Sequence, residues 1–143
     1  MAASLHALPD LPVSHASELR IEIPGDPAHV RVARLVAADA AGRAGFDCDD
    51  ADDLRIAVDE MCHTLMASAT GDLSLRFEIR PGRVDVTIGA RSRGSVRPFA
   101  LHELSEMILT AVTDGHELVA TPSELRILAA KRATPPAARK VAR

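Results

Sequence analysis

Residues 53–66 (DLRIAVDEMCHTLM) carry two side chains whose types and spacing suit chemistry, Glu60 and Thr64. The apolar residues of this segment recur at helical spacing, which predicts an amphipathic helix. Residues four apart on a helix are neighbours on one face, so the carboxylate and the hydroxyl would lie side by side. Such a pair can form half of a catalytic site or of an ion-binding site with oxygen ligands. It is also compatible with the solvated edge of a packing helix.

An acidic run begins this helix, at residues 47–53 (DCDDADD). Its aspartates are expected to cap the helix and to interact favourably with the helix dipole. A calcium site is a poorer interpretation, because the spacing and the glycine of a calcium-binding loop are absent. Gly71 and Asp72 are expected to end the helix. Its packing stripe is expected to consist of Leu54, Ala57, Val58, Met61 and Leu65.

A strand and another helix are expected before this segment. Residues 18–23 (ELRIEI) alternate polar and apolar side chains, as a half-buried strand does. Asp26 then supplies an N-cap and Pro27 a first-turn residue for a helix that Gly45 ends. The residues of that helix that stand at helical spacing are Val32, Leu35, Val36, Asp39 and Ala40.

The second half of the chain predicts a β-hairpin, a third helix and two further strands. Residues 73–79 and 83–88 alternate as strands do, and Pro81 and Gly82 suit the tight turn between them. Residues 89–98 are expected to form a small, basic loop. The third helix is expected over residues 99–113 and the last two strands over residues 116–120 and 124–131, with helical spacing at Leu101, Leu104, Ile108, Leu109 and Val112.

This order of elements predicts an α+β fold with two layers. Helices and strands do not alternate strictly, so the simplest arrangement is a mixed, mostly antiparallel sheet with three helices on one face. One domain is expected over residues 18–131. Residues 1–17 are expected to be a flexible lead-in, and residues 132–143 a basic, disordered tail that aids solubility or meets an acidic partner.

The composition excludes several classes of function. The chain has 143 residues, of which 47% are apolar and 26% charged, as in a globular protein with one core. Aromatic residues make up only 2%, which argues against stacking on single-stranded nucleic acid. A net charge of −3 argues against general binding to nucleic acid or anionic membranes. No membrane span or signal peptide is recognisable, so a cytoplasmic protein is expected.

The two cysteines, Cys48 and Cys62, are not spaced as metal ligands. Both are expected to be reduced, inert thiols. Cys62 and His63 are adjacent and cannot share one helix face, so a zinc site at this pair fails on geometry.

Several segments together resemble a known family. They are residues 53–62 (DLRIAVDEMC), 27–45 (PAHVRVARLVAADAAGRAG), 109–119 (LTAVTDGHELV) and 125–132 (LRILAAKR). In order and spacing they are similar to the bacterial anti-sigma-factor serine/threonine kinases. That family belongs to the superfamily of histidine kinases, gyrase and mismatch-repair ATPases. The resemblance covers residues 18–131 and implies the fold of these ATPases.

The resemblance implies roles for particular residues. Glu60 falls on the general base that acts toward a serine of the anti-anti-sigma factor. Thr64 falls where an asparagine holds magnesium, and a hydroxyl is a poorer fixed ligand than an amide oxygen. Ala90 replaces an aspartate that recognises adenine. Ser92 replaces the first glycine of the nucleotide loop, while Gly94 fits the second.

A second glycine pair of the family is also replaced, by Glu103 and Ser105. A glutamate near nucleotide phosphates would repel them. The resemblance therefore implies that the helical framework is kept while most ATP contacts are gone, so that binding of ATP and magnesium is weak or absent.

The family also suggests contacts with a partner. It has an arginine early in the first helix that meets the sigma or anti-anti-sigma partner, which points to Arg31, with Arg34 beside it; a solvated helix charge is the alternative. The basic residues of the loop are expected to be solvated, or to hold phosphate or an acidic partner: Arg91, Arg93 and Arg97.

Three functions follow as hypotheses. The favoured one is a degenerate anti-sigma factor that binds a sigma factor or its antagonist and makes little or no use of ATP. The second is an active ATP-dependent protein kinase with Glu60 as base. The third is an unrelated interaction domain, such as a dimeric partner of a competent kinase subunit. Glu60 itself is a surface carboxylate, a retained residue that shapes a surface, or an active base. Family members pair as homodimers, so a homodimer is expected.

Overall fold

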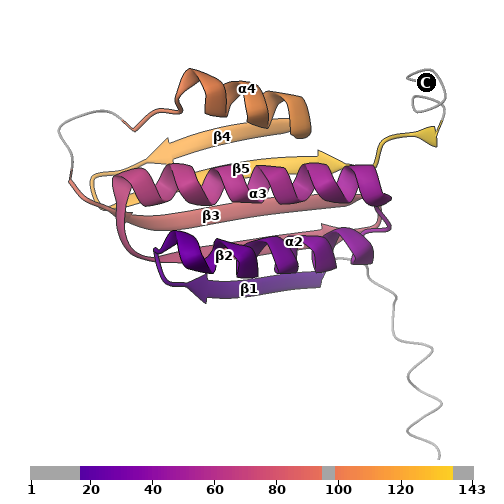
Figure 1. The fold of residues 1–143 in the computed structure, drawn as a ribbon, viewed down its shortest axis with the longest axis horizontal. Helices are drawn as coiled ribbons and strands as arrows, with labels where there is room; N and C mark the ends of the chain where they lie inside the picture. Colours follow the sequence, from indigo (N-terminus) through magenta and orange to yellow (C-terminus); the bar gives the residue numbers. More distant parts are fainter. Residues whose placement is uncertain (1–16, 95–98, 137–143) are drawn as a thin grey trace, which may run out of the picture.

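Three helices lie on one face of a five-stranded sheet in the computed structural model, which describes residues 17–94 and 99–136 (Figure 1). The strands pair in the order β1-β2-β3-β5-β4, and every one of these pairings is antiparallel. The two-layer α+β prediction is confirmed, although the sheet is antiparallel throughout rather than mixed. The elements are β1 (Ser17–Ile23), the 3-10 turn η2 (Pro27–His29), α2 (Val30–Arg43), α3 (Cys48–Ser68), β2 (Ala69–Arg80), β3 (Arg83–Ser92), α4 (Glu103–Val112), β4 (Gly115–Ala120) and β5 (Glu124–Arg132).

The predicted caps are where the sequence places them. The Asp26 side chain accepts a hydrogen bond from the Ala28 amide at 2.9 Å. Asp47 caps α3 in the same way, accepting from the Asp50 amide at 2.9 Å. Gly45, with a φ of 79°, follows α2 in the left-handed conformation that ends many helices. Local sequence therefore decides where η2 and α3 begin and where α2 ends, whereas α2 follows η2 at Val30 without a side-chain cap of its own.

The inner face of α2 is made almost entirely of alanine. Ala33, Ala37, Ala40 and Ala41 are completely buried, and Ala44 follows them at the C-cap with 3% exposure. Small side chains let the axis of α2 lie close to α3 and the sheet. The larger residues Val32 and Leu35, which stand at helical spacing in the sequence, point to solvent instead, with 41% and 65% exposure. The packing face is thus selected by size rather than by hydrophobicity.

Helix α3 is the centre of the helical layer. It lies between α2 and α4 over the middle of the sheet (Figure 1). Its predicted packing stripe is confirmed, because Leu54, Ala57, Val58, Met61 and Leu65 are all buried. No helix within the described residues is long and apolar enough to cross a membrane.

Cys62 is also buried in α3, whereas Cys48 is exposed at its start. Burial, together with the nearby Asp59 carboxylate, raises the pKa of the Cys62 thiol from 9.0 to about 12. The thiol is therefore protonated and inert at neutral pH.

Several predicted boundaries are wrong, among them the start of β2, which is Ala69 rather than residue 73. Helix α3 ends at Ser68, and Gly71, with a φ of 78°, lies inside β2 where the pairing register shifts. Strand β3 continues to Ser92, through what was expected to be loop. Helix α4 begins at Glu103 rather than at residue 99, and it ends at Val112, one residue before the predicted end. Leu104, expected to pack, is 67% exposed because α4 turns Ser105 and Leu109 inward.

A buried polar cluster ties the end of β5 to the start of α3. Asp50 is 2% exposed, and the Thr134 amide and hydroxyl donate to its carboxylate at 2.8 and 2.7 Å. The Lys131 ammonium lies 3.7 Å from Asp50 and 3.1 Å from Asp53. Ser17 belongs to β1 and Arg132 to β5, one residue beyond the predicted domain at each end. The rest of the predicted lead-in and residues 137–143 of the predicted tail lie outside the described residues.

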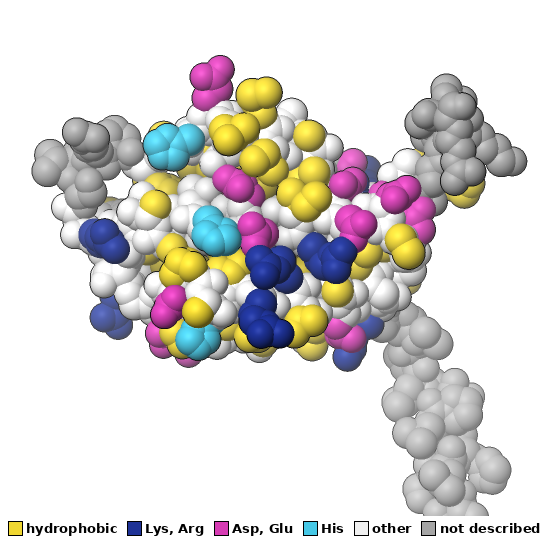
Figure 2. All heavy atoms as spheres, viewed as in Figure 1, with side chains coloured by type: hydrophobic (Ala, Val, Ile, Leu, Met, Phe, Trp, Pro, Cys, Tyr) yellow, Lys and Arg dark blue, Asp and Glu magenta, His cyan; other side chains and the backbone are white. Residues whose placement is uncertain are grey.

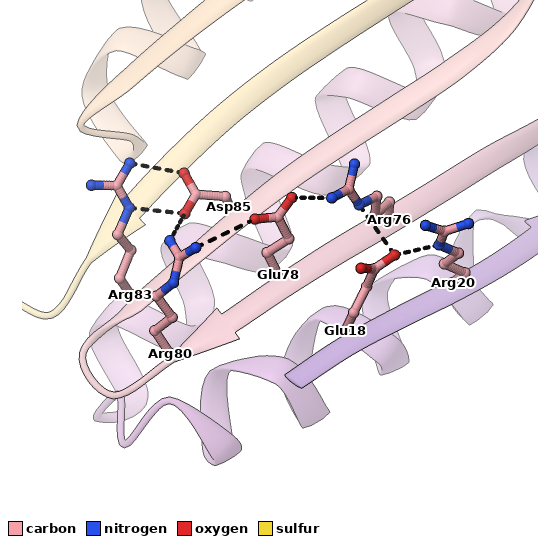
Figure 3. Close-up of polar contacts among 7 residues, drawn as sticks. All are labelled: Glu18, Arg20, Arg76, Glu78, Arg80, Arg83 and Asp85. Atoms are coloured by element: carbon pink, nitrogen blue, oxygen red, sulfur yellow. Dashed lines mark hydrogen bonds and ion pairs between the residues drawn. The ribbon is translucent and has the colours of Figure 1, made fainter. Parts of the chain in front are cut away.

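The other face of the sheet carries a chain of ion pairs instead of helices (Figure 3). The Arg20 guanidinium donates to Glu18 and lowers the pKa of that carboxyl, with a further contribution from Arg76. Exposed pairs of this kind contribute little to stability and are screened by salt. They keep the face solvated. The chain consists of Glu18, Arg20, Arg76, Glu78, Arg80, Arg83 and Asp85.

Replacing Gly25 by alanine is expected to destabilise the protein by about 1–3 kcal/mol. A Cβ atom at this position would lie 2.2 Å from the Gly71 carbonyl oxygen, which belongs to the backbone of β2 and cannot move alone. Gly42→Ala is the matched control, because nothing lies within 4 Å of its Cβ position and α2 should gain up to about 1 kcal/mol. Urea unfolding of both variants measures the difference, and equal stabilities would contradict the close approach.

Cys62 is expected to be unreactive toward a thiol reagent at pH 8, whereas Cys48 is expected to react rapidly. In the native chain one thiol should react rapidly with the reagent, and in the C48S variant none should. In denaturant, one additional thiol should react in each protein. The folded thiol has the higher pKa, so the folded state keeps its proton where the unfolded chain loses it. Stability should therefore fall as the pH rises from 9 toward 12. Rapid labelling of native C48S would contradict this assignment.

Candidate functional site

Glu60, the predicted base, is held by a residue of another helix. It is half-buried on α3, and the Ser105 hydroxyl of α4 donates a hydrogen bond to its Oε1 atom at 2.5 Å. Ser105 itself is only 7% exposed. Sequence comparison assigned Ser105 to a lost glycine of the nucleotide loop, whereas in the structure it contacts the base position directly. Thr64 lies one turn further along α3 and is also half-buried.

Two of the predicted nucleotide residues lie at a hollow that Glu60 does not line. Ala90 and Ser92 line an open hollow of about 900 Å³ at the edge where β3 ends, together with Gly71 and Glu124. Neither Glu60 nor Thr64 lines it. Ala90 is only 6% exposed, so its methyl group belongs to the core as much as to the hollow.

The segment after β3 is braced by its own side chains. The Gly94 amide donates to the Ser92 hydroxyl at 3.1 Å, and Gly94 has a φ of 70°. The Arg93 guanidinium donates to the Ala69 carbonyl at 2.8 Å, so it ties this segment to the start of β2. Arg91 is exposed, and Arg97 lies outside the described residues. Glu103 is exposed in the first turn of α4.

Arg31 and Arg34 lie in a groove between α2 and α3. The groove has a volume of about 690 Å³ and contains apolar side chains that are open to solvent, with Leu35 65% and Ile56 46% exposed. Figure 2 shows Lys and Arg side chains gathered over these two helices, with hydrophobic side chains around them. The lining residues, called the α2–α3 groove below, are Arg31, Arg34, Leu35, Ala38, Asp52, Arg55, Ile56 and Asp59.

Two of the three arginines in the groove have acidic partners. Arg34 pairs with Asp59, and Arg55 pairs with Asp52. Arg31 has no ion pair with any residue in the described parts of the chain. The groove therefore presents an apolar floor and one uncompensated positive charge.

Sequence reasoning selected Arg31 and Arg34 but missed the opposite wall of the groove. Arg55, Ile56 and Asp59 sit on the outer side of α3, away from its packing stripe. Ile56 was the available signal, because a large aliphatic residue outside the stripe marks an exposed apolar position.

A metal site is not evident. Among residues 17–94 and 99–136, no three His, Cys, Asp or Glu side chains are grouped so as to hold a metal ion. The ligand role expected of Thr64 stays a prediction.

Comparison with known proteins identifies the fold family. A family model described as "Histidine kinase-like ATPase domain" matches residues 23–117. A solved structure of the RsbU and RsbW domains of Rv1364c from Mycobacterium tuberculosis superposes with a TM-score of 0.64, covering 84% of this chain and 33% of that one. At 12% sequence identity, that likeness shows the fold alone.

Curated relatives give the same result at the level of sequence. Serine-protein kinase RsbW of Bacillus licheniformis is 32% identical over 78 residues, which are 51% of this chain and 49% of the relative. RsbW of Bacillus subtilis (strain 168) is 30% identical over 80 residues, or 52% and 50%. The chain thus spans about half the length of the curated relatives it matches. The resemblance seen in the sequence is confirmed, and since the family model matches well over half of its residues, the chain belongs to the histidine kinase-like ATPase domain family.

Proposed function

We propose that this chain is an anti-sigma-factor-like regulatory protein that binds a sigma factor or an anti-anti-sigma factor through the α2–α3 groove, with weak or lost nucleotide binding. The similarity to RsbW serine-protein kinases supports the class of function. The observation that carries the proposal is the combination of exposed Leu35 and Ile56 with the uncompensated charge of Arg31.

The groove has the chemistry of a protein-binding surface. Burying Leu35 and Ile56 under a partner would remove apolar area from water, at about 25 cal/mol per Å². Arg34 and Arg55 are already neutralised by Asp59 and Asp52, so they can be covered without leaving a free charge. Arg31 then offers the position for one carboxylate. The partner segment that fits presents a large apolar side chain with an acidic residue beside it.

The residues at the nucleotide positions support weak nucleotide binding. One carboxylate oxygen of Glu60 is already engaged by Ser105. Thr64 offers a hydroxyl where magnesium favours a stronger oxygen ligand. Ala90 has no acceptor for an adenine amino group and is nearly buried. This donor set does not fit a magnesium nucleotide, and no chemical step is assigned to one.

An active kinase is the second candidate. It is favoured by one observation, the half-buried carboxylate of Glu60 on α3, together with the kinase activity named for the RsbW relatives. For Glu60 to act as a base through its Oε1 atom, the Ser105 hydroxyl would first have to leave that oxygen.

Introducing a carboxylate in the groove is expected to weaken partner binding. Arg31→Glu and Leu35→Glu should each weaken binding at least about tenfold. In R31E the new carboxylate repels the acidic residue of the partner, and in L35E a carboxylate is buried where an apolar contact was made. Arg20→Glu is the control, since Arg20 is an exposed arginine on the helix-free face of the sheet. Calorimetric titration against the purified sigma factors and anti-anti-sigma factors encoded in the same genome measures it. Equal affinities for R31E, L35E and the unmodified chain would remove the groove from the proposal.

Magnesium-ATP is expected to leave thermal stability unchanged. A ligand stabilises a protein only by binding its folded state, so millimolar nucleotide should raise Tm by less than about 1 °C if the dissociation constant is above that concentration. Differential scanning calorimetry with and without nucleotide measures it, with magnesium alone as the control. A rise of several degrees would favour the kinase.

A further inference from the structure

Helix α4 is the least embedded of the three helices. Of its ten residues, only Ser105 and Leu109 are buried, while Leu104 and Met107 are 67% and 62% exposed. A helix of this length is not stable by itself in water, so its attachments decide whether it stays in place. Among the described residues, α4 is attached by the buried side chain of Leu109, by partly buried residues of α4 beside it, and by two polar contacts with other elements.

The two polar contacts differ in kind. His116 of β4 lies 2.9 Å from Glu106, a first-turn residue of α4 whose side chain is 55% exposed. In the first turn, the buried Ser105 hydroxyl donates to Glu60 on α3 at 2.5 Å. A short bond from a hydroxyl to a carboxylate is among the stronger hydrogen bonds in proteins, and burial protects it from competing water.

Serine is not the residue that α4 alone would favour at this position. Alanine fits a small buried site equally well and has the higher helix propensity. The contribution of the Ser105 hydroxyl is therefore its hydrogen bond to Glu60. It uses a lone pair of a carboxylate that would otherwise be available to a hydroxyl or a cation from outside.

We propose that Ser105 is a positioning residue that latches α4 over α3 and, in doing so, keeps the Oε1 atom of Glu60 occupied. An outside hydroxyl or cation reaches that oxygen only by displacing Ser105, and displacement releases the first turn of α4. One hydrogen bond thus determines both whether α4 is closed over α3 and whether this oxygen of Glu60 is available. The inference rests on the second candidate function, the kinase, only in taking Glu60 as the group that is regulated.

Carboxyl labelling tests whether Glu60 is occupied. The full chain is treated with a carbodiimide and glycine amide, and labelling of Glu60 is measured by mass spectrometry relative to the exposed Glu103. In S105A, Glu60 should label about tenfold faster than in the unmodified chain, as expected for the loss of one hydrogen bond to a charged group. Thr110→Ala, a change at an exposed position of the same helix, should have no effect. Equal labelling of Glu60 in S105A and T110A overturns the proposal.

Hydrogen exchange of the α4 amides tests the latch itself. S105A and E60Q should each speed exchange over residues 103–112, and the double variant should be no faster than the faster single variant, because both changes weaken the same bond. Additive effects would mean that the two residues stabilise α4 independently, which overturns the latch. Neither measurement needs nucleotide or partner, so a failure of the proposed function would leave these results unchanged.

Discussion

The close approach of α2 to α3 and the sheet is the constraint on which the rest of the structure depends. A face of fully buried alanines permits it, and any larger side chain there would push α2 outward. The same arrangement turns Val32 and Leu35 to solvent and brings Arg34 to Asp59 across the helix pair. The groove is therefore a by-product of how α2 packs, and a fold with a bulkier inner face would not have it.

The two candidate regions of the molecule meet on α3. This helix contributes Ile56 and Asp59 to the groove with α2. It also carries Glu60, which accepts the hydrogen bond from Ser105 of α4. Ile56 and Glu60 are four residues apart and are therefore neighbours on the helix surface. A change in the position of α3 would consequently affect the groove and the Glu60 contact together.

Much of the fold could be predicted from sequence, because its signals are local. Asp26, Asp47 and Gly45 mark helix ends through contacts within a few residues. The packing stripe of α3 follows from the helical spacing of its apolar residues. Val32 and Leu35 were misplaced because periodicity ranks residues by hydrophobicity, whereas the packing of α2 selects small size.

The parts of the candidate site that could not be predicted depend on tertiary contacts. Ser105 and Glu60 are 45 residues apart, and nothing near either residue predicts their bond. Ile56 lies outside the packing stripe that spacing predicts for α3, so its exposure could be predicted, but its place in a groove with α2 could not. The contact of Ser105 with Glu60 could not be predicted from the family alignment, because that alignment assigns a position in a loop while contact with α3 depends on where α4 begins.

The cluster around Asp50 has a consequence for the order of folding. Asp50 lies in the first turn of α3, yet the groups that donate to its carboxylate come from Thr134, 84 residues later. Closing so long a loop costs entropy that only an almost complete sheet can offset. We therefore expect the first turn of α3 to reach its final environment only when β5 has joined β3. Burial of the central helix then depends on the last strand of the sheet.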